Sequence, residues 1–267
     1  MQDVADVDIV KMVWRARSVR DNLDCFELLR TKQQPMIAMC MGEHGLMSRV
    51  LSPKFGGFGV YGSVEGHEAT APNQPTIEKL NGLFRFKDIN ADTKLFGVIG
   101  SHVLQSSGPA FHNAAFEVAD MNAVYLPIPI PAEWEHFKAT FLELFHCEHL
   151  SFAGASITLP HKTHMLKLLD ELHGSADGIV VVGEIGGDAE EVLAQKIIDE
   201  NFEKPVVAYI AGRKAPKEKR MGHAGAIVMG NYGSAESKIT MFSKANIPVA
   251  KKPVELPILL AGKMEKK

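Results

Sequence analysis

Three stretches of the sequence place a nucleophilic or basic side chain where a reaction partner could approach it. His223 lies among glycine and alanine in "RMGHAGAIVMGNYG", Lys162 ends the stretch "SITLPHK", and Lys11 interrupts the apolar run "VDIVKMV". Neutral imidazole is a good nucleophile near pH 7, and a desolvated lysine can form a Schiff base with a ketone. The small neighbours of His223 indicate that a ligand comes close to its ring.

Each of these residues also has a plain structural interpretation. His223 fits a turn, and Glu184 in "GEIGG" fits a surface acid at a strand end. Lys11 fits a strand edge with its ammonium in water, and its spacing alone favours that alternative. Lys162 fits a surface lysine at a helix N-terminus, although the helix dipole repels a cation there and favours a functional reason.

The elements that must position these residues alternate along the chain. Apolar runs of strand length are separated by amphipathic segments of helix length, which predicts an α/β fold with parallel sheets covered by helices. Such folds carry their chemistry at the carboxyl ends of strands. The expected strands are 7–13, 35–41, 58–64, 94–100, 122–130, 152–159, 178–185, 205–211 and 224–230.

Composition favours a soluble cytoplasmic protein. The 267 residues are 46% hydrophobic and 23% charged, with a formal net charge of −3, so no nucleic-acid partner is expected. The basic run 213–220 is expected to be a solvated loop. Three scattered cysteines predict neither a disulfide framework nor a metal site. We expect no signal peptide and no membrane-spanning segment.

The first segment contains the stretches "MGEHGLMSRVLSPKFGGF" and "ATAPNQPTIEKL". Both resemble the C-terminal part of type I 3-dehydroquinate dehydratase, in the form fused to shikimate dehydrogenase. The resemblance implies that Lys11 is the Schiff-base lysine and that Arg49 grips the substrate carboxylate through its bidentate fork. It also implies that Thr70 stands where the family has serine and that Gln74 belongs to the substrate lid loop.

This resemblance predicts only part of a barrel. Type I dehydratases are eight-stranded βα barrels, and the chain is expected to begin near the sixth strand, after the family's catalytic histidine. Three strands cannot close a barrel and leave an open edge. We therefore expect a catalytically incomplete dehydratase segment over residues 1–90.

The second segment resembles the substrate-binding domain of shikimate dehydrogenase. In "TKLFGVIGSHVLQSSGPAFHNAAF", Ser106 matches the first carboxylate-binding serine of the family. Gly108 replaces the second serine and Gln105 replaces a histidine. The loss of one hydroxyl donor to a charged acceptor costs roughly 1.5–3 kcal/mol, so weaker substrate binding is expected.

The stretch "GASITLPHK" carries the catalytic part of the same resemblance. It implies that Thr158 contacts substrate and that Lys162 is the catalytic lysine acting on the hydroxyl being oxidised. The family uses NADP in a Rossmann domain with a GxGxxG-type loop, and no such spacing follows residue 173. We therefore expect a substrate-binding α/β domain over 93–173 that binds no NADP by itself.

The third segment resembles the C-terminal, flavodoxin-like CoA-ligase domain of the succinyl-CoA synthetase alpha subunit. The resemblance implies that His223, in "GHAGAI", carries phosphate between nucleotide and succinate, and that Glu184 holds its imidazole. The family needs a CoA-binding domain and a beta-type subunit that supplies ATP or GTP. We expect this chain alone to bind neither CoA nor nucleotide.

The sequence is thus expected to be a chimera with segments 1–90, 93–173 and 177–267. Three hypotheses remain open. The chain could be a shikimate-pathway protein that binds 3-dehydroquinate or shikimate, with dehydratase (lyase) and dehydrogenase (oxidoreductase) ancestry. It could be a phosphohistidine domain of a succinate–CoA ligase, acting on succinate and CoA with a beta-type partner. It could also be a non-catalytic chain that only folds or assembles.

Overall fold

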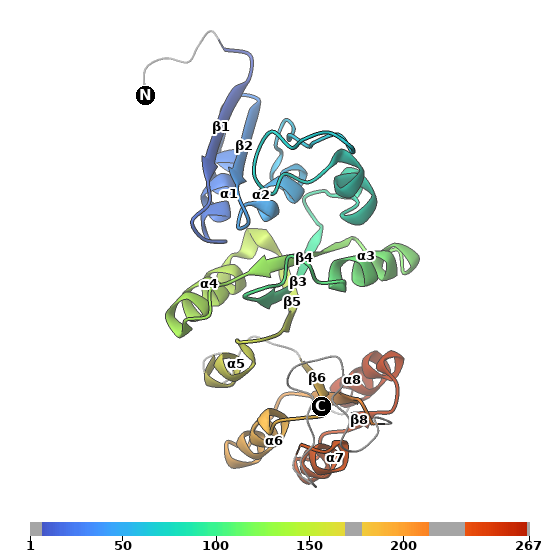
Figure 1. Cartoon of the computed structure of the whole chain (residues 1–267). Helices are drawn as coiled ribbons and strands as arrows, with labels where there is room; N and C mark the ends of the chain where they lie inside the picture. The colour runs from blue at the N-terminus through green and yellow to red at the C-terminus, as the bar shows by residue number, and fades with distance from the viewer. Residues whose placement is uncertain (1–6, 169–177, 214–232, 266–267) are drawn as a thin grey trace. The chain divides into compact units, whose positions relative to one another are not determined.

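The computed structural model describes residues 7–168, 178–213 and 233–265. The chain forms two compact units, Met1–Met165 and Leu166–Lys267 (Figure 1). Within the described residues no helix is long and apolar enough to cross a membrane. The predicted junction near 173–177 lies outside the described residues and stays a prediction.

The first unit opens with a parallel βαβ element. Strand β1 (Val10–Arg15) pairs in register with β2 (Met36–Met41), and α1 (Asp21–Thr31) connects them. Helix α2 (Leu46–Val50) follows β2. Helix α1 buries Cys25, Phe26 and Leu29, and the Phe26 ring stacks on Phe55 at 4.1 Å between centroids. This apolar face fixes the helix against the two-stranded sheet.

The third expected strand of this segment, at 58–64, is a wrong prediction. Only an isolated bridge forms there, between Ser63 and Thr76. Four glycines lie in the stretch 56–62, and glycine weakens a strand because it packs no side chain and loses more chain entropy. A short π-helix, η2 (Lys79–Leu83), follows this bridge. The described residues therefore form two barrel-type strands rather than three, and no barrel closes.

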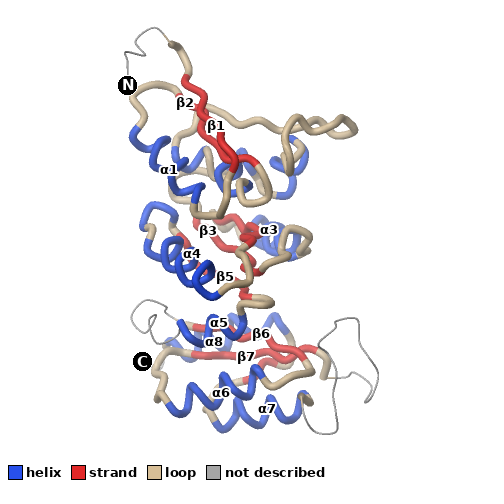
Figure 2. The backbone as a smooth tube through the Cα atoms, turned by 60° about the vertical axis from the view of Figure 1, so that its left-hand side comes forward, coloured by secondary structure: helices blue, strands red, loops and turns tan. Residues whose placement is uncertain are grey.

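The second sheet of the first unit has the order β4-β3-β5 and is parallel throughout. Every residue of β4 is buried, because helices cover both faces (Figures 1 and 2). Helix α3 follows β3 and α4 follows β4 on the opposite side, as right-handed crossovers in opposite directions require. The elements are β3 (Lys94–Gly100), α3 (Gly108–Val118), β4 (Ala123–Pro129), α4 (Trp134–His146), β5 (Phe152–Ile157) and α5 (Lys162–Leu168).

Lys54 ties the first segment to this sheet. Its ammonium is buried and donates to the carbonyl oxygens of Ala91 and Thr93 at 2.6 and 2.9 Å, and to Ser151 Oγ at 3.1 Å. Burial lowers the pKa of Lys54. Because its three acceptors are neutral oxygens, Lys54 fastens the connection between the segments by hydrogen bonds rather than by an ion pair.

The second unit holds a parallel sheet of order β6-β7-β8. Alternate residues of β7 face two cores: Val206, Ala208 and Ile210 pack with Phe242 of α7, and Val207 packs with Leu256 of α8. Strand β8 and helix α8 were not predicted from the sequence. The elements are β6 (Ile179–Glu184), α6 (Ala189–Asp199), β7 (Val206–Ala211), α7 (Ala235–Lys244), β8 (Val249–Ala250) and α8 (Leu256–Met264).

Candidate functional site

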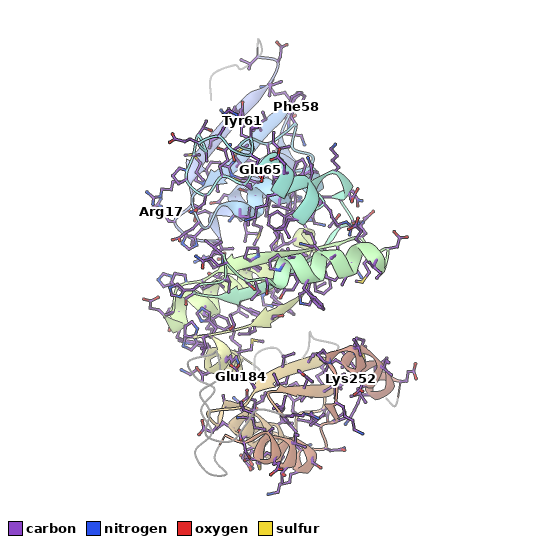
Figure 3. All side chains as sticks on the ribbon, turned by 45° about the vertical axis from the view of Figure 1, so that its right-hand side comes forward. Arg17, Phe58, Tyr61, Glu65, Glu184 and Lys252 are labelled. Carbon is purple, nitrogen blue, oxygen red and sulfur yellow. The ribbon has the colours of Figure 1, made fainter. Side chains whose placement is uncertain are left out.

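Lys11 and Arg49 meet at one residue, Tyr61. The Lys11 ammonium lies 4.1 Å from the centroid of the Tyr61 ring, a cation–π distance. The Arg49 guanidinium donates from Nη1 to the backbone oxygen of Tyr61 at 2.9 Å. Tyr61 itself is 46% exposed and is labelled in Figure 3. The two predicted residues therefore share one partner, which the sequence did not single out.

Arg49 is a buried cation with neutral partners. It is 3% exposed, and burial lowers the pKa of its guanidinium. Besides Tyr61 it donates to Met39 Sδ at 3.1 Å. No carboxylate lies within ion-pair distance of Arg49 in the part of the chain that the structure describes. Because a buried charge is costly without a counter-ion, this site favours an anionic ligand.

Lys11 occupies an exposed position in β1. This is the position that the strand-edge alternative describes, since β1 has a neighbour only on the β2 side within the described sheet. The apolar run around Lys11 therefore does not bury it. Its ammonium contacts the ring of Tyr61, whereas Arg49 contacts the backbone oxygen of the same residue.

Thr70 and Gln74 contact each other. The Thr70 hydroxyl donates to Gln74 Oε1 at 2.9 Å, and Gln74 is 9% exposed whereas Thr70 is exposed. Both lie in the loop 64–76 that precedes η2. In this arrangement the glutamine acceptor is occupied by the threonine rather than presented to solvent.

A second group of predicted residues follows the carboxyl ends of β3 and β5. The Ser106 hydroxyl accepts a hydrogen bond from the backbone of Gly108 at 3.1 Å, and Lys162 is the half-buried first residue of α5. The Thr158 backbone donates to Ile99 at 2.9 Å. A side chain at Gly100 would place its Cβ 2.5 Å from the Thr158 methyl group, so glycine is needed there. These residues share one sheet edge, as the strand order predicts.

Two residues of this edge were missed by sequence reasoning. The Tyr125 hydroxyl donates to Ser156 Oγ at 2.8 Å, and burial raises the pKa of Tyr125. His161 is fully buried, places Nε2 3.0 Å from the Ile130 oxygen and stacks on Phe137 at 4.6 Å. Burial lowers the pKa of His161. His161 lies in apolar surroundings directly before Lys162 and anchors the start of α5. The motif "LPHK" contains this histidine and could have indicated it.

The third predicted site is only partly within the described residues. His223 lies outside them. Glu184 ends β6, and its backbone N–H donates to Glu190 Oε1 at 3.3 Å. Glu190 is held in turn by Lys238, which is fully buried and donates to Glu190 and Glu191 at 2.6 and 2.7 Å. The loop after Glu184 is thereby fixed by a buried ion-pair cluster that the sequence did not reveal.

The same loop approaches the start of α7. The backbone of Gly186 donates to the Gly233 oxygen at 2.7 Å, and Gly233 has a φ of +71°. A Cβ on Gly233 would lie 3.0 Å from Gly186 Cα, so glycine is required at this contact. The Ser234 side chain then caps α7 by accepting from Ser237. Gly233, the first described residue after 214–232, therefore contacts the loop that follows Glu184.

Two family models match the first two thirds of the chain. The model of type I 3-dehydroquinase matches residues 2–91, and that of the shikimate dehydrogenase substrate-binding domain matches residues 98–183. A bifunctional 3-dehydroquinate dehydratase/shikimate dehydrogenase of Arabidopsis thaliana, described as chloroplastic, is 38% identical over 178 residues. This match covers 67% of the chain and 28% of that protein.

The chain is also similar to a different enzyme. Subunit alpha 2 of the ADP-forming succinate–CoA ligase of Archaeoglobus fulgidus is 53% identical over 125 residues, covering 47% of the chain and 42% of the subunit.

A solved dehydroquinate dehydratase and shikimate dehydrogenase from S. pombe has a TM-score of 0.27 at 15% identity, covering 97% of the chain and 62% of that structure. The chain spans less than a third of the plant relative and less than half of the ligase subunit.

Proposed function

We propose that the first unit of this chain binds carboxylated six-membered rings of the shikimate pathway. The chain joins a sequence similar to the dehydratase–dehydrogenase to one similar to the CoA-ligase alpha subunit. The ligands of this class are 3-dehydroquinate and shikimate. The observation that carries the proposal is Arg49, a buried guanidinium with only neutral partners among the described residues. A ring carboxylate would supply the counter-ion that this guanidinium lacks.

Lys11 extends the proposal from binding to covalent chemistry. With the carboxylate at Arg49, the ring ketone of 3-dehydroquinate would lie within reach of the ammonium over Tyr61. After losing a proton, Nζ attacks the carbonyl carbon, the carbonyl oxygen leaves as water, and an imine forms. The dehydration that would follow needs a general base, and we assign that role to no residue of this chain. The proposed activity is therefore imine formation without turnover.

Shikimate would bind at the second sheet edge. Ser106 would donate its hydroxyl proton to the carboxylate, since its oxygen already accepts from Gly108. Thr158 and Lys162 would contact the ring hydroxyls, with Lys162 as proton carrier for the hydroxyl that is oxidised. Hydride transfer needs NADP, and the GxGxxG-type loop that holds it is not found among the motifs of this sequence. We therefore propose binding without oxidation.

Borohydride trapping tests the Lys11 proposal. The full chain is incubated with 3-dehydroquinate and sodium borohydride, and the adduct is located by intact mass and peptide mapping. We expect a stable adduct on Lys11 that disappears in Lys11→Arg and falls strongly in Arg49→Met. An adduct that persists in Lys11→Arg, or no adduct in the folded wild type, would overturn it. Isothermal titration with shikimate, with Lys162→Met beside the wild type, tests the second edge.

A second candidate function rests on Glu184 and its support. Glu184 is placed by a loop that a buried cluster fixes, and the ligase relatives include one at 53% identity. We propose that His223 accepts a phosphoryl group from nucleotide in the presence of a beta-type ligase subunit, with succinate and CoA as the further substrates. Acid-labile phosphate should appear on the wild type and not on His223→Ala. Equal labelling of both proteins would refute this candidate.

A further inference from the structure

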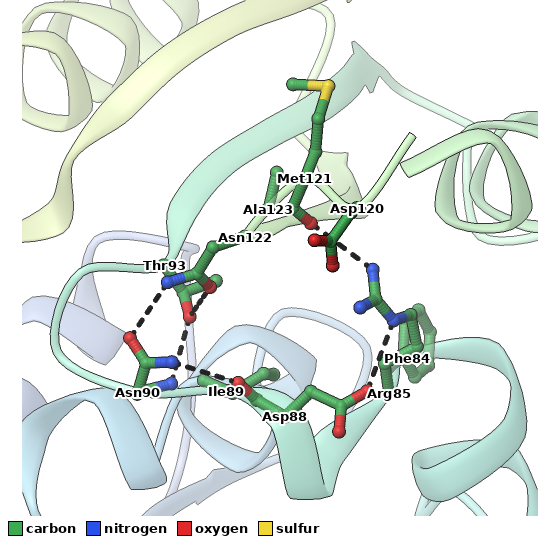
Figure 4. Close-up of a pocket in the computed structure, with 10 residues that line it drawn as sticks. All are labelled: Phe84, Arg85, Asp88, Ile89, Asn90, Thr93, Asp120, Met121, Asn122 and Ala123. Atoms are coloured by element: carbon green, nitrogen blue, oxygen red, sulfur yellow. Dashed lines mark hydrogen bonds and ion pairs between the residues drawn. The ribbon is translucent and has the colours of Figure 1, made fainter. Parts of the chain in front are cut away.

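A polar pocket lies at the amino-terminal ends of β3 and β4 (Figure 4). The predicted substrate residues follow the carboxyl ends of strands in the same sheet, so this pocket belongs to the opposite edge. Its volume is about 190 Å³. It is lined by Phe84, Arg85, Asp88, Ile89, Asn90, Thr93, Asp120, Met121, Asn122 and Ala123.

The charged side chains of the pocket come from both segments of the first unit. Arg85 donates from Nε to the Asp88 carboxylate at 3.3 Å and from Nη1 to the Met121 oxygen at 3.4 Å. Both distances lie at the long end of the hydrogen-bond range, so the guanidinium is only weakly engaged. Asp120 supplies a second carboxylate, to which no described residue donates a hydrogen bond or forms an ion pair.

Both Arg85 and Asp120 adopt left-handed backbone conformations, with φ of 52° and 51°. Aspartate is among the residues that tolerate this region, whereas a long side chain such as arginine seldom occupies it. Both residues follow a helix end, where a left-handed residue is common: Asp120 follows α3 and donates its backbone N–H to the Glu117 oxygen, and Arg85 follows η2. Both charged residues line the same pocket (Figure 4).

A rigid hydrogen-bond network forms the rest of the polar wall. Asn122 donates to Asn90 Oδ1 at 2.9 Å, and the Thr93 hydroxyl donates to Asn122 Oδ1 at 2.7 Å. The Asn90 backbone donates to Thr93 Oγ1 at 2.9 Å. These three residues satisfy one another, which leaves Arg85, Asp88 and Asp120 as the groups with capacity for a ligand.

We propose that this pocket binds a small zwitterion of the α-amino acid type with an apolar side chain. The ligand carboxylate pairs with Arg85, and the ammonium pairs with Asp120 and Asp88. The apolar side chain lies against Phe84, Ile89, Met121 and Ala123. A dianion such as phosphate would face two carboxylates, and a simple cation would face Arg85. A zwitterion satisfies both signs at once.

The pocket volume agrees with a ligand of this size. Sites for drug-sized molecules enclose roughly 300–1,000 Å³, and 190 Å³ is smaller. The lining runs from 84–90 in the first segment through Thr93 to 120–123 in the second. A bound amino acid would therefore join the two segments at the connection that Lys54 also fastens.

Isothermal titration of the full chain with L-leucine tests this proposal. We expect saturable binding that is lost with N-acetyl-L-leucine, which has no ammonium, and with L-leucinamide, which has no carboxylate. Each analogue keeps the apolar side chain, so the comparison isolates the charges. Absence of saturable L-leucine binding, or equal binding of either analogue, would overturn the proposal.

Variants locate the site. Asp120→Asn and Arg85→Gln should each weaken L-leucine binding about tenfold or more, since each removes a charged partner. Glu117→Gln is the matched control: it makes the same charge change on an exposed residue of α3 outside the pocket and should bind like the wild type. Unchanged binding by folded Asp120→Asn contradicts the assignment. If a variant does not fold, the analogue comparison on the wild type still decides.

Discussion

Two buried cations in this chain differ in whether a carboxylate of the fold is paired with them. Lys238 in the second unit is fully buried and ion-paired with Glu190 and Glu191, at 2.6 and 2.7 Å. Arg49 in the first unit is 3% exposed and donates only to a thioether sulfur and a backbone oxygen among the described residues. Carboxylates of the fold itself neutralise Lys238, whereas the counter-ion of Arg49 would have to come from a ligand.

The difference separates structural charges from functional ones. A buried cation with its own carboxylates stabilises the native state only as part of the cluster, and removing one member leaves the others uncompensated. A buried cation without a counter-ion lowers stability unless neutral acceptors surround it, as three oxygens do at Lys54, or a ligand completes it, as we propose for Arg49. This contrast predicts opposite outcomes when the two cations are removed.

Lys238→Met should have the largest effect. It leaves Glu190 and Glu191 paired with no cation, and breaking a buried pair typically costs about 3–5 kcal/mol. We expect a marked loss of hydrogen-exchange protection in peptides from β6 and α6, read by mass spectrometry. Lys244→Met is the control, since Lys244 is exposed on the same helix. Equal protection in Lys238→Met and Lys244→Met would break the comparison.

Lys54→Met should have an intermediate effect. It removes hydrogen bonds to the Ala91 and Thr93 oxygens and leaves them without this donor, at a cost of about 1–3 kcal/mol. The connection between the segments should become sensitive to protease near 85–93, while the sheet β4-β3-β5 stays folded. Limited proteolysis with fragment masses measures this. The exposed Lys87→Met should leave the cleavage pattern unchanged.

The stability of the first unit should fall as the solution becomes acidic. Burial lowers the folded-state pKa of His161 below its unfolded value of about 6.5. The neutral ring is then favoured in the fold, so this stability is complete above pH 6.5 and is lost as pH falls below about 6.5. One proton changes the free energy of unfolding by at most about 1.4 kcal/mol per pH unit.

Chemical unfolding at pH 7.5 and 5.5 measures this dependence. His161→Phe keeps a ring on Phe137 but cannot be protonated, so its loss of stability between the two pH values should be smaller. His112 is half-buried and its pKa is also lowered by desolvation, so some acid sensitivity should remain. An identical pH dependence in His161→Phe and the wild type would show that His161 is not its source.

Arg49→Met should change stability least. Removing a desolvated charge offsets the loss of the Tyr61 hydrogen bond, so we expect a change within about 1 kcal/mol. Imine trapping on Lys11 should nevertheless fall strongly. A small stability change with lost trapping would sharpen the contrast with Lys238, whereas a loss of several kcal/mol would make Arg49 a structural residue.

The strands that pack on both faces were well predicted from the sequence. Strand β3 has the predicted bounds, because its apolar residues need cover on both sides of a parallel sheet. The segment 58–64 was wrongly predicted, because its alternating apolar residues are outweighed by glycines. The short β8 was missed, since Val249–Ala250 forms a strand only through its pairing with β7.

The candidate site shows the same division. Local motifs indicated Lys11, Arg49, Thr158 and Lys162 one at a time. Their partners are remote in the sequence: Tyr61 lies beyond both Lys11 and Arg49, and the Tyr125 hydroxyl meets Ser156 across the sheet. No spacing rule joins such residues, because their contact depends on how strands and loops are packed.

The sequence by itself determined the α/β class, the three kinds of segment and the residues that could react, because these depend on local periodicity and short motifs. Only the tertiary structure decided that Lys11 is exposed, that Arg49 is buried without a carboxylate and that Lys238 is buried with two. Burial and pairing set the free energy of a charge, and both arise from contacts between distant parts of the chain.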